Sequence, residues 1–236
     1  MGRIFEKRKY KMFARFDRMA KAFTKIGREI AIAVKSGGPD PSYNPRLRLA
    51  IQNAKGVNMP KDRIDAAIKR ASEKSTAGFE EIVYEAYAPH GIALMIECTS
   101  DNVNRTVANM RHILKTGNGS LSTSGSVAFL FERKGIFTLD PATVPDAEAL
   151  ELELIDHGME EFERTGEELL LYSSFDGFGS LQKALEERNI ASKSAELQYL
   201  PMARKELPED QAKEVLELIE SLEADDDVQS VFHNLH

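Results

Sequence analysis

The sequence contains no tryptophan and a single cysteine, Cys98, among its 236 residues. One cysteine cannot form an intrachain disulfide, and its place inside an apolar run predicts a small buried residue in a protein from a reducing compartment. The five histidines show no metal-ligand spacing and no neighbouring pair of cysteines. We therefore expect neither a disulfide framework nor a metal site.

Long apolar runs are also absent. No stretch approaches the roughly 20 residues that a membrane-spanning helix needs, and the N-terminus lacks the continuous apolar core of a secretion signal. The Gly/Ser-rich segment 117–126 lacks the Gly-Lys-Ser/Thr ending of a phosphate-binding P-loop and the Gly-x-Ser-x-Gly elbow of hydrolases. We expect a cytoplasmic protein that is not an enzyme, with no cofactor, no small-molecule substrate and no membrane partner.

Charge is strongly segregated along the chain, which the total of -7 conceals. Residues 1–74 contain 19 Lys and Arg against 7 Asp and Glu, a net charge of +12. Residues 75–236 contain 12 against 31, a net charge of -19. A basic module attracts phosphates and releases their counterions, whereas an acidic body repels polyanions. The N-terminal part is therefore predicted to bind nucleic acid.

The basic part shows the pattern of three helices. Apolar residues over 12–30 recur at alternating steps of four and three, which predicts a helix that ends near residues 36–39. Asn44 as N-cap and Pro45 at the first position predict a second helix that ends at Lys55. A third is expected to begin at Met59-Pro60 and to continue through residue 71. Together they predict a compact three-helix domain.

The uncovered faces of these helices are largely cationic. Simple solvation of exposed charge is the competing interpretation for any such face. The candidate nucleic-acid-binding residues are Lys11, Arg15, Arg18, Lys21, Lys25, Arg28, Arg46, Arg48, Lys55, Lys61, Arg63, Lys69 and Arg70.

From Phe79 onward the hydrophobic period changes to that of strands. Residues 82–88 and 92–99 are predicted to form two strands that join in a hairpin at Pro89-His90-Gly91. A helix over 103–115 and a strand over 127–133 follow. The helix after Pro208 and the strand over 228–232 lack a domain of their own, so we expect them to complete this one.

Between these pieces, residues 135–205 show the order βαββαβ, which is ferredoxin-like. The predicted fold class is α+β: an N-terminal three-helix domain is followed by two ferredoxin-like α+β domains, the third inserted in the second. The predicted domains are a basic three-helix domain at 1–78, a discontinuous α+β domain at 79–134 and 206–236, and a ferredoxin-like βαββαβ domain at 135–205.

Three polar loops, at 58–60, 101–105 and within the Gly/Ser segment 117–126, are further candidates. Helix capping is the favoured interpretation of 101–105, and a mobile loop that of 117–126. Asp225-Asp226-Asp227 is expected to be a solvated turn rather than a calcium loop. The candidate functional loop residues are Asn58, Met59, Pro60, Asp101, Asn104, Arg105, Gly119, Ser120, Ser124 and Gly125.

Several ordered motifs resemble those of the YebC/PmpR family over essentially the whole chain. They are Phe23-Thr24-Lys25-x-x-Arg28-Glu29-Ile30, Gly37-Gly38-Pro39-Asp40-Pro41, Asn44-Pro45-Arg46-Leu47-Arg48, Asn58-Met59-Pro60-Lys61-Asp62, Ala67-Ile68-Lys69-Arg70, Thr99-x-Asp101-Asn102-x-Asn104-Arg105-Thr106-Val107 and Gly119-Ser120-Leu121-x-x-Ser124-Gly125-Ser126-Val127. The start, Met1-Gly2-Arg3-Ile4-Phe5-Glu6, departs from the common Gly-His-Ser-Lys-Trp opening of the family.

The resemblance implies three domains, one all-helical and two α+β. Members of the family are described largely as probable transcriptional regulators that bind DNA. Related members, including the mitochondrial translational activator of cytochrome oxidase, imply action on the ribosome. The expected function is therefore nucleic-acid binding in the regulation of gene expression, either on duplex DNA in transcription or on ribosomal RNA in translation. A protein-interaction scaffold with an incidental basic face is the third possibility.

Overall fold

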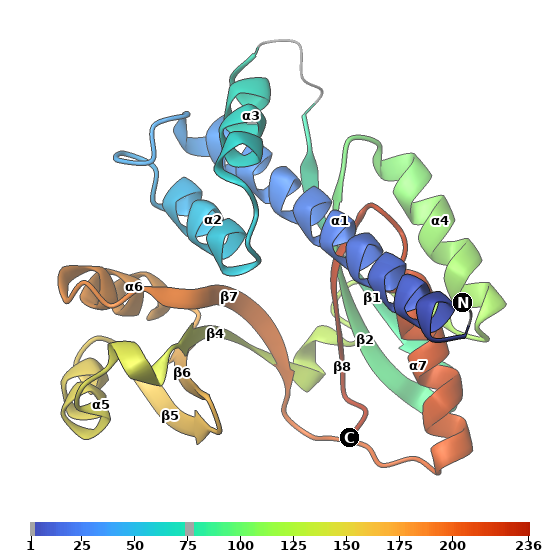
Figure 1. Cartoon of the computed structure of the whole chain (residues 1–236). Helices are drawn as coiled ribbons and strands as arrows, with labels where there is room; N and C mark the ends of the chain where they lie inside the picture. Colours follow the sequence, from blue (N-terminus) through green and yellow to red (C-terminus); the bar gives the residue numbers. More distant parts are fainter. Residues whose placement is uncertain (1–2, 74–77) are drawn as a thin grey trace. The chain divides into compact units, whose positions relative to one another are not determined.

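The computed structural model describes the backbone of residues 3–73 and 78–236 and the side chains of residues 19–73 and 78–236. The chain forms two compact units, Met1–Phe79 and Glu80–His236. Figure 1 colours them from blue to cyan and from green to red. Within the described residues, none of the helices has both the length and the hydrophobicity that a bilayer crossing requires.

The first unit consists of the helices α1 (Arg3–Gly37), α2 (Pro45–Gly56) and α3 (Lys61–Ser72) (Figure 1). These three helices are the ones that the sequence predicts. Both α2 and α3 pack against α1. The shared core is built from Ile26, Ile30, Val34, Leu47, Ala54, Met59 and Ile64.

Asn44 joins the end of α1 to the start of α2. Its Oδ1 accepts the N–H of Leu47 at 3.0 Å, which caps α2 as predicted, and its Nδ2 donates to the carbonyls of Ala33 at 2.7 Å and Gly38 at 2.8 Å. A Cβ on Gly37 would lie 2.7 Å from Asn44 Cγ, so this close approach requires glycine. The loop between the two helices is therefore anchored at both ends.

The second unit begins with a four-stranded antiparallel sheet. Its strands are β1 (Glu80–Ala88), β2 (Ile92–Ser100), β3 (Ser120–Leu121) and β8 (Val228–His233), in the order β3-β1-β2-β8. The 3-10 turn η1 (Pro89–Gly91) closes the predicted hairpin between β1 and β2. The last strand therefore joins this sheet, as expected, from the far end of the sequence.

Helices α4 (Val103–Thr116) and α7 (Glu209–Glu223) pack together against one face of this sheet. Cys98 lies in that core and is 2 % exposed, so the prediction of a small buried residue is confirmed. A smaller cluster on the other face brings the rings of Tyr199 and Phe232 to within 5.6 Å of each other. The largest buried side chains between sheet and helices are Ile92, Leu94, Ile96, Met110 and Leu114.

The second sheet consists of β4 (Phe131–Leu139), β5 (Met159–Thr165), β6 (Glu168–Ser174) and β7 (Ser192–Pro201), in the antiparallel order β5-β6-β4-β7. The chain reaches it after β3 and leaves it before α7. The insertion that the sequence predicts is therefore present in the fold.

Two helices pack on the second sheet: α5 (Ala147–Ile155) and α6 (Phe178–Glu187). A 3-10 turn, η3 (Pro141–Thr143), precedes α5. The Phe137 ring of β4 stacks on Phe178 of α6, with centroids 4.7 Å apart. Element order and strand order together confirm the ferredoxin-like βαββαβ arrangement of this part.

One predicted pair of strands is wrong. We expected 127–133 and 135–139 to be separate strands, the first belonging to the β1–β2 sheet. The structure has a 3-10 turn, η2 (Ala128–Leu130), and then β4 as one continuous strand of the second sheet. Gly135 does not break it, because glycine is needed there for close packing: a Cβ would clash with the Phe178 ring and with Ser173 Oγ.

Candidate nucleic-acid interface

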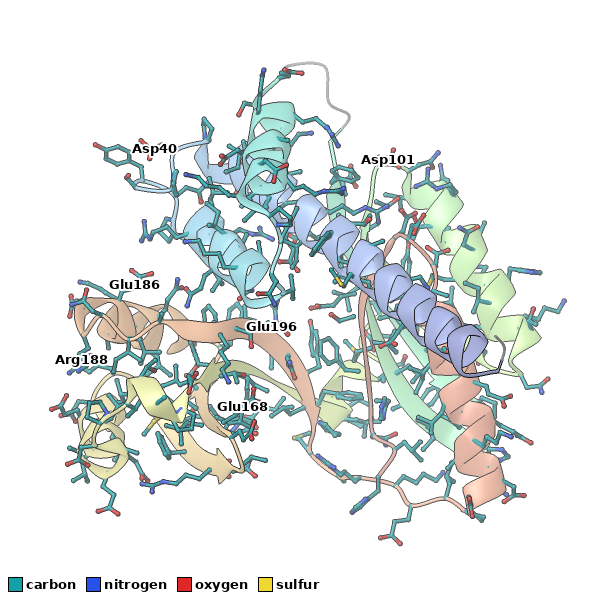
Figure 2. The ribbon with its side chains drawn as sticks, in the orientation of Figure 1. Asp40, Asp101, Glu168, Glu186, Arg188 and Glu196 are labelled. Carbon is teal, nitrogen blue, oxygen red and sulfur yellow. The ribbon has the colours of Figure 1, made fainter. Side chains whose placement is uncertain are left out.

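Among residues 19–73, whose side chains the structure describes, exposed cations of the first unit lie on all three helices (Figure 2). The predicted cations with exposed side chains are Lys21, Arg46, Lys55, Lys61, Arg63, Lys69 and Arg70. Lys25, Arg28 and Arg48 are half-buried. Lys11, Arg15 and Arg18 lie in α1, and their side chains are outside the described residues. Exposed Lys and Arg are what phosphate contacts require.

Arg48 was expected to be an exposed phosphate ligand, but its side chain is half-buried and bonded to the backbone of its own chain. Its Nη1 donates to the carbonyl oxygens of Pro41 at 2.8 Å and Ser42 at 3.2 Å. The side chain thus turns back from the first turn of α2 and fixes the preceding loop. Helical spacing places Arg48 on the polar side of α2 but does not show which loop lies beside it.

Arg28 is also held by its own unit. Its guanidinium carbon lies 5.7 Å from the centroid of the Phe79 ring, within the range of a cation–π contact. A half-buried, stacked guanidinium is less available to a phosphate than the exposed cations of α2 and α3. We therefore rank it below them as a ligand.

The loop 38–44 presents an aromatic residue that the sequence analysis missed. Asp40 Oδ1 accepts the N–H of Ser42 at 2.8 Å, and the Asp40 carbonyl accepts the N–H of Tyr43 at 3.2 Å. The Tyr43 side chain is 85 % exposed. Figure 2 labels Asp40 on this protruding loop. The sequence signal that could have identified Tyr43 is an aromatic residue in a polar loop between two basic helices.

The turn between α2 and α3 contains the first candidate loop. Asn58 is exposed with φ 58°, a left-handed conformation that asparagine tolerates. Met59 is 8 % exposed and belongs to the helical core, so it is not a surface ligand. Pro60 is exposed and stands at the N-cap of α3 without a side-chain oxygen. A helix start of this kind, followed by Lys61, can receive an anion.

The second candidate loop, 101–105, is held in a polar cluster. Asn102 caps α4 by accepting the N–H of Arg105 at 3.1 Å, so the capping interpretation is confirmed. Arg105 Nη2 donates to Asp101 at 2.8 Å and to Asp227 at 2.9 Å. Thr106 Oγ1 donates to Asp227 Oδ2 at 2.8 Å. Asn104 is exposed on the first turn of α4.

This cluster overturns the expectation of a solvated turn at 225–227. Asp227 is 3 % exposed, because the start of β8 lies against the start of α4. A buried carboxylate needs such partners, since removing a charge from water is costly. The ion pair of Arg105 and Asp227 therefore joins the start of α4 to the start of β8. The two residues are 122 positions apart in the chain, so the sequence alone does not reveal the pair.

The third candidate loop, in the Gly/Ser segment, is organised around the buried carboxylate of Glu85. This carboxylate accepts the N–H groups of Gly125 and Val127 at 2.6 Å and of Ala128 at 2.9 Å. Burial alone would raise the pKa of Glu85, but these backbone hydrogen bonds outweigh it and lower the pKa below 4.5. The segment is thus anchored, and its backbone donors are already used by a carboxylate of the same chain.

The same segment packs closely on β1. A Cβ on Gly119 would lie 2.7 Å from the carbonyl oxygen of Tyr87, so glycine permits the contact. Ser120 lies in β3, and its side chain is exposed. Ser124 and Gly125 are also exposed, at the tip of the loop. These residues form an exposed polar loop, and their role as a binding site stays a prediction.

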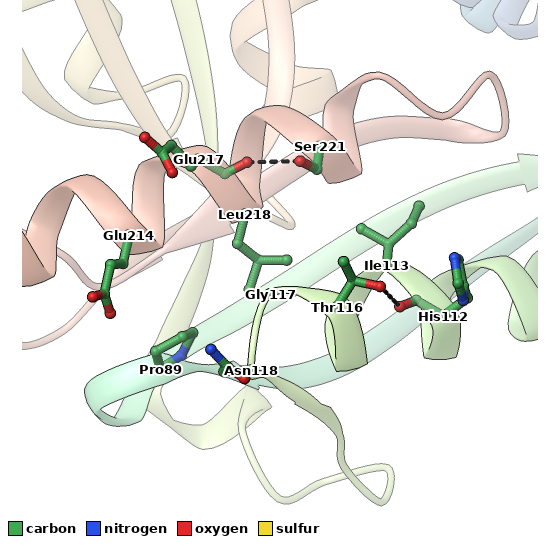
Figure 3. A pocket seen from close by; sticks show the side chains of 10 residues that line it. All are labelled: Pro89, His112, Ile113, Thr116, Gly117, Asn118, Glu214, Glu217, Leu218 and Ser221. Atoms are coloured by element: carbon green, nitrogen blue, oxygen red, sulfur yellow. Dashed lines mark hydrogen bonds between the residues drawn. The ribbon is translucent and has the colours of Figure 1, made fainter.

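A hollow of about 390 Å³ lies between the end of α4 and α7 (Figure 3). Its floor includes Ile113 and Leu218, and its α7 side carries Glu214 and Glu217. Glu214 Oε2 lies 2.8 Å from His90 Nε2. Carboxylates at the rim disfavour a phosphate ligand. Within residues 19–73 and 78–236 there is also no group of three His, Cys, Asp or Glu that could hold a metal ion.

Two domain descriptions match the chain. The "TACO1/YebC protein N-terminal domain" matches residues 3–74, and the "TACO1/YebC second and third domain" matches residues 79–235. The first match covers the basic helical unit. The second covers both sheets.

Curated relatives match the chain from end to end. A "probable transcriptional regulatory protein" of Anaeromyxobacter dehalogenans is 55% identical, with 100% of each chain covered. A protein of the same description from Myxococcus xanthus is 53% identical, also with 100% of each chain covered. Among solved structures, a conserved hypothetical protein from Aquifex aeolicus is 37% identical, with a TM-score of 0.79 over 92% of this chain and 90% of that one.

Proposed function

Because the chain belongs to the TACO1/YebC family, we propose that it is a nucleic-acid-binding regulator of gene expression, acting as a DNA-binding transcriptional regulatory protein in the cytoplasm. One observation carries the proposal: exposed Lys and Arg gather on the first unit, whose net charge is +12, while the second unit carries -19. The description of the relatives as probable transcriptional regulatory proteins supports it.

The physical mechanism is contact with phosphates. Each Lys or Arg that neutralises a phosphate releases a condensed counterion, so affinity should fall steeply as salt rises. The acidic second unit would be repelled by the same polyanion, which confines contact to the first unit. No residue is assigned a catalytic role.

A second candidate function is that of a ribosome-associated, RNA-binding translation factor. It is favoured by the way the exposed cations spread over three helices, since direct reading of duplex DNA needs a compact cluster of side chains at base edges. Folded RNA rewards the spacing of phosphates and shape instead. The polar loops 56–61 and 119–126 would then reach a functional centre.

Competition titrations at fixed ionic strength separate the two functions. A preference of roughly a thousandfold or more for one duplex over random duplexes marks a specific regulator. Weak selectivity together with salt-sensitive sedimentation with ribosomal particles would favour the translation factor instead. Protein that binds neither class of nucleic acid at low salt would contradict both and leave the protein-interaction scaffold.

A further inference from the structure

We propose that Tyr43 is a stacking platform for an unpaired base, so that the basic unit binds unpaired nucleotides more tightly than uninterrupted duplex. The inference rests on the proposed nucleic-acid function and names the class of substrate. The ligand chemistry is an unpaired base beside its phosphate, in RNA or in DNA.

The exposure of Tyr43 is the first argument. Aromatic side chains usually contribute to stability by burying their large apolar surface. The Tyr43 ring is 85 % exposed and so gains almost none of this stabilisation. It is the most exposed large hydrophobic or aromatic side chain among the described residues. A ring held in water in this way is suited to contact with a flat ligand.

The second argument is that the backbone beneath the ring is fixed. Asn44 is buried and bonds to two backbone carbonyls, while Arg48 donates to the carbonyl of Ser42. Asp40 also accepts two backbone hydrogen bonds, from the N–H of Ser42 and from the N–H of Tyr43 itself. A ligand that stacks on Tyr43 therefore meets a preorganised loop, which lowers the entropic cost of binding.

The third argument is the charge around the ring. Arg46 is exposed three residues further on, in the first turn of α2, where it can contact the phosphate that adjoins a stacked base. Asp40 is the acidic residue of the loop, and its Oδ1 already accepts the N–H of Ser42. The unit around this loop is cationic overall, which favours a polyanion over an uncharged apolar partner.

The stacking of the bases then decides between duplex and unpaired nucleic acid as the preferred ligand. In a duplex each base is already stacked on its neighbours, so the ring can reach one only after it is unstacked. Unpaired bases in loops and single strands stack on aromatic side chains without that cost. Phosphate contacts by the exposed cations are common to both substrates. Stacking on Tyr43 is what distinguishes them.

The absence of tryptophan from the sequence allows a direct test. In the full chain, Tyr43→Trp creates the only indole fluorophore, whose emission is quenched when a base stacks on it. The probes are an RNA hairpin with an unpaired loop and a blunt RNA duplex of the same stem, each with a DNA counterpart. The control is Leu152→Trp, at an exposed position of α5 in the acidic second unit. We expect quenching by the hairpins in Tyr43→Trp only.

Affinities complete the test. Tyr43→Ala should weaken binding to the hairpins by roughly tenfold or more, a loss typical of one stacked base, and should leave duplex binding within about twofold. Tyr43→Phe keeps the ring and should behave as the wild type. Equal affinity of the wild type for hairpin and duplex, or no quenching in Tyr43→Trp, would overturn the proposal while the proposed function stands. If no probe binds at low salt, the proposed function fails as well.

Discussion

Asn44 Nδ2 donates a 2.7 Å hydrogen bond to the carbonyl oxygen of Ala33, eleven residues earlier in the chain. The bond ties the last turns of α1 to the start of α2. Tyr43 and Arg46 stand on either side of Asn44, so the same joint positions the two residues that we propose to contact a base and its phosphate. The buried side chain of Asn44 therefore supports both the stability of the first unit and the geometry of the proposed binding site.

The first prediction concerns this joint. Asn44→Ala removes the cap of α2 and the two hydrogen bonds that Asn44 Nδ2 donates to the carbonyls of Ala33 and Gly38, so we expect a loss of about 2 to 4 kcal/mol in the free energy of unfolding. Chemical denaturation of the full chain, followed by circular dichroism, measures it. Ser42→Ala, on the exposed part of the same loop, should change stability by less than about 0.5 kcal/mol. Equal effects of the two changes would contradict the anchoring role.

The second prediction separates two arginines of one helix. Arg46→Glu with Lys55→Glu should weaken nucleic-acid binding and leave the melting temperature nearly unchanged, because exposed charges contribute little to folding. Arg48→Ala should lower stability by about 1 kcal/mol through the loss of its bonds to the loop carbonyls. Melting curves and anisotropy titrations on the same samples measure both. A stability loss confined to the Arg46/Lys55 variant would reverse the assignment.

The third prediction is a pH dependence from Glu85. Its pKa is lowered in the folded chain because the bonds from Gly125, Val127 and Ala128 outweigh burial. The ionised carboxylate therefore stabilises the fold above pH 4.5, and this contribution is lost as the pH falls below that value. Glu85→Gln should be less stable than the wild type at pH 7, with a difference that shrinks in acid. Glu80→Gln, exposed on the same strand, is the control, and a difference independent of pH would contradict this role.

The fourth prediction tests the buried end of the 101–105 cluster. Asp227→Asn keeps the shape of the side chain but removes the charge that Arg105 and Thr106 contact. We expect a loss of about 2 kcal/mol, below the full value for a buried ion pair because Arg105 is partly exposed. Asp226→Asn, at an exposed position next to it, should have a much smaller effect in the same urea titration. Similar losses for both would show that Asp227 acts only as a turn residue.

The sequence predicted the fold well where the signal was local. Apolar spacing and Asn44-Pro45 predicted the basic helices, and period-two alternation with Pro89-His90-Gly91 predicted the first hairpin. These signals arise within a few residues of the element they describe. These local signals do not depend on which other parts of the chain pack against the helix or strand.

The errors occurred where a distant partner decides the outcome. A separate strand was predicted to begin at Gly135, yet β4 runs through this residue because Phe178, 43 residues away, packs where its side chain would be. Arg48 was expected to be exposed, but it fixes the preceding loop. Met59 was a candidate functional-loop residue, but it enters the core. Glu85 could have been noticed as a carboxylate in a buried strand, although its partners lie 40 to 43 residues further on.

The most direct test of the central claim compares charge reversals on the two units. Lys61→Glu with Lys69→Glu changes exposed cations of the first unit, and Lys183→Glu with Lys213→Glu changes exposed cations of the second. The measurement is the affinity of each full-length variant for one duplex and one RNA hairpin over a range of salt concentrations.

For the wild type we expect the logarithm of affinity to fall linearly with the logarithm of salt concentration. The slope should become shallower by about two in Lys61→Glu/Lys69→Glu, one for each phosphate contact removed, and stay unchanged in Lys183→Glu/Lys213→Glu. Equal slopes in both variants, or a larger change from the second unit, would contradict the assignment of nucleic-acid binding to the basic helices.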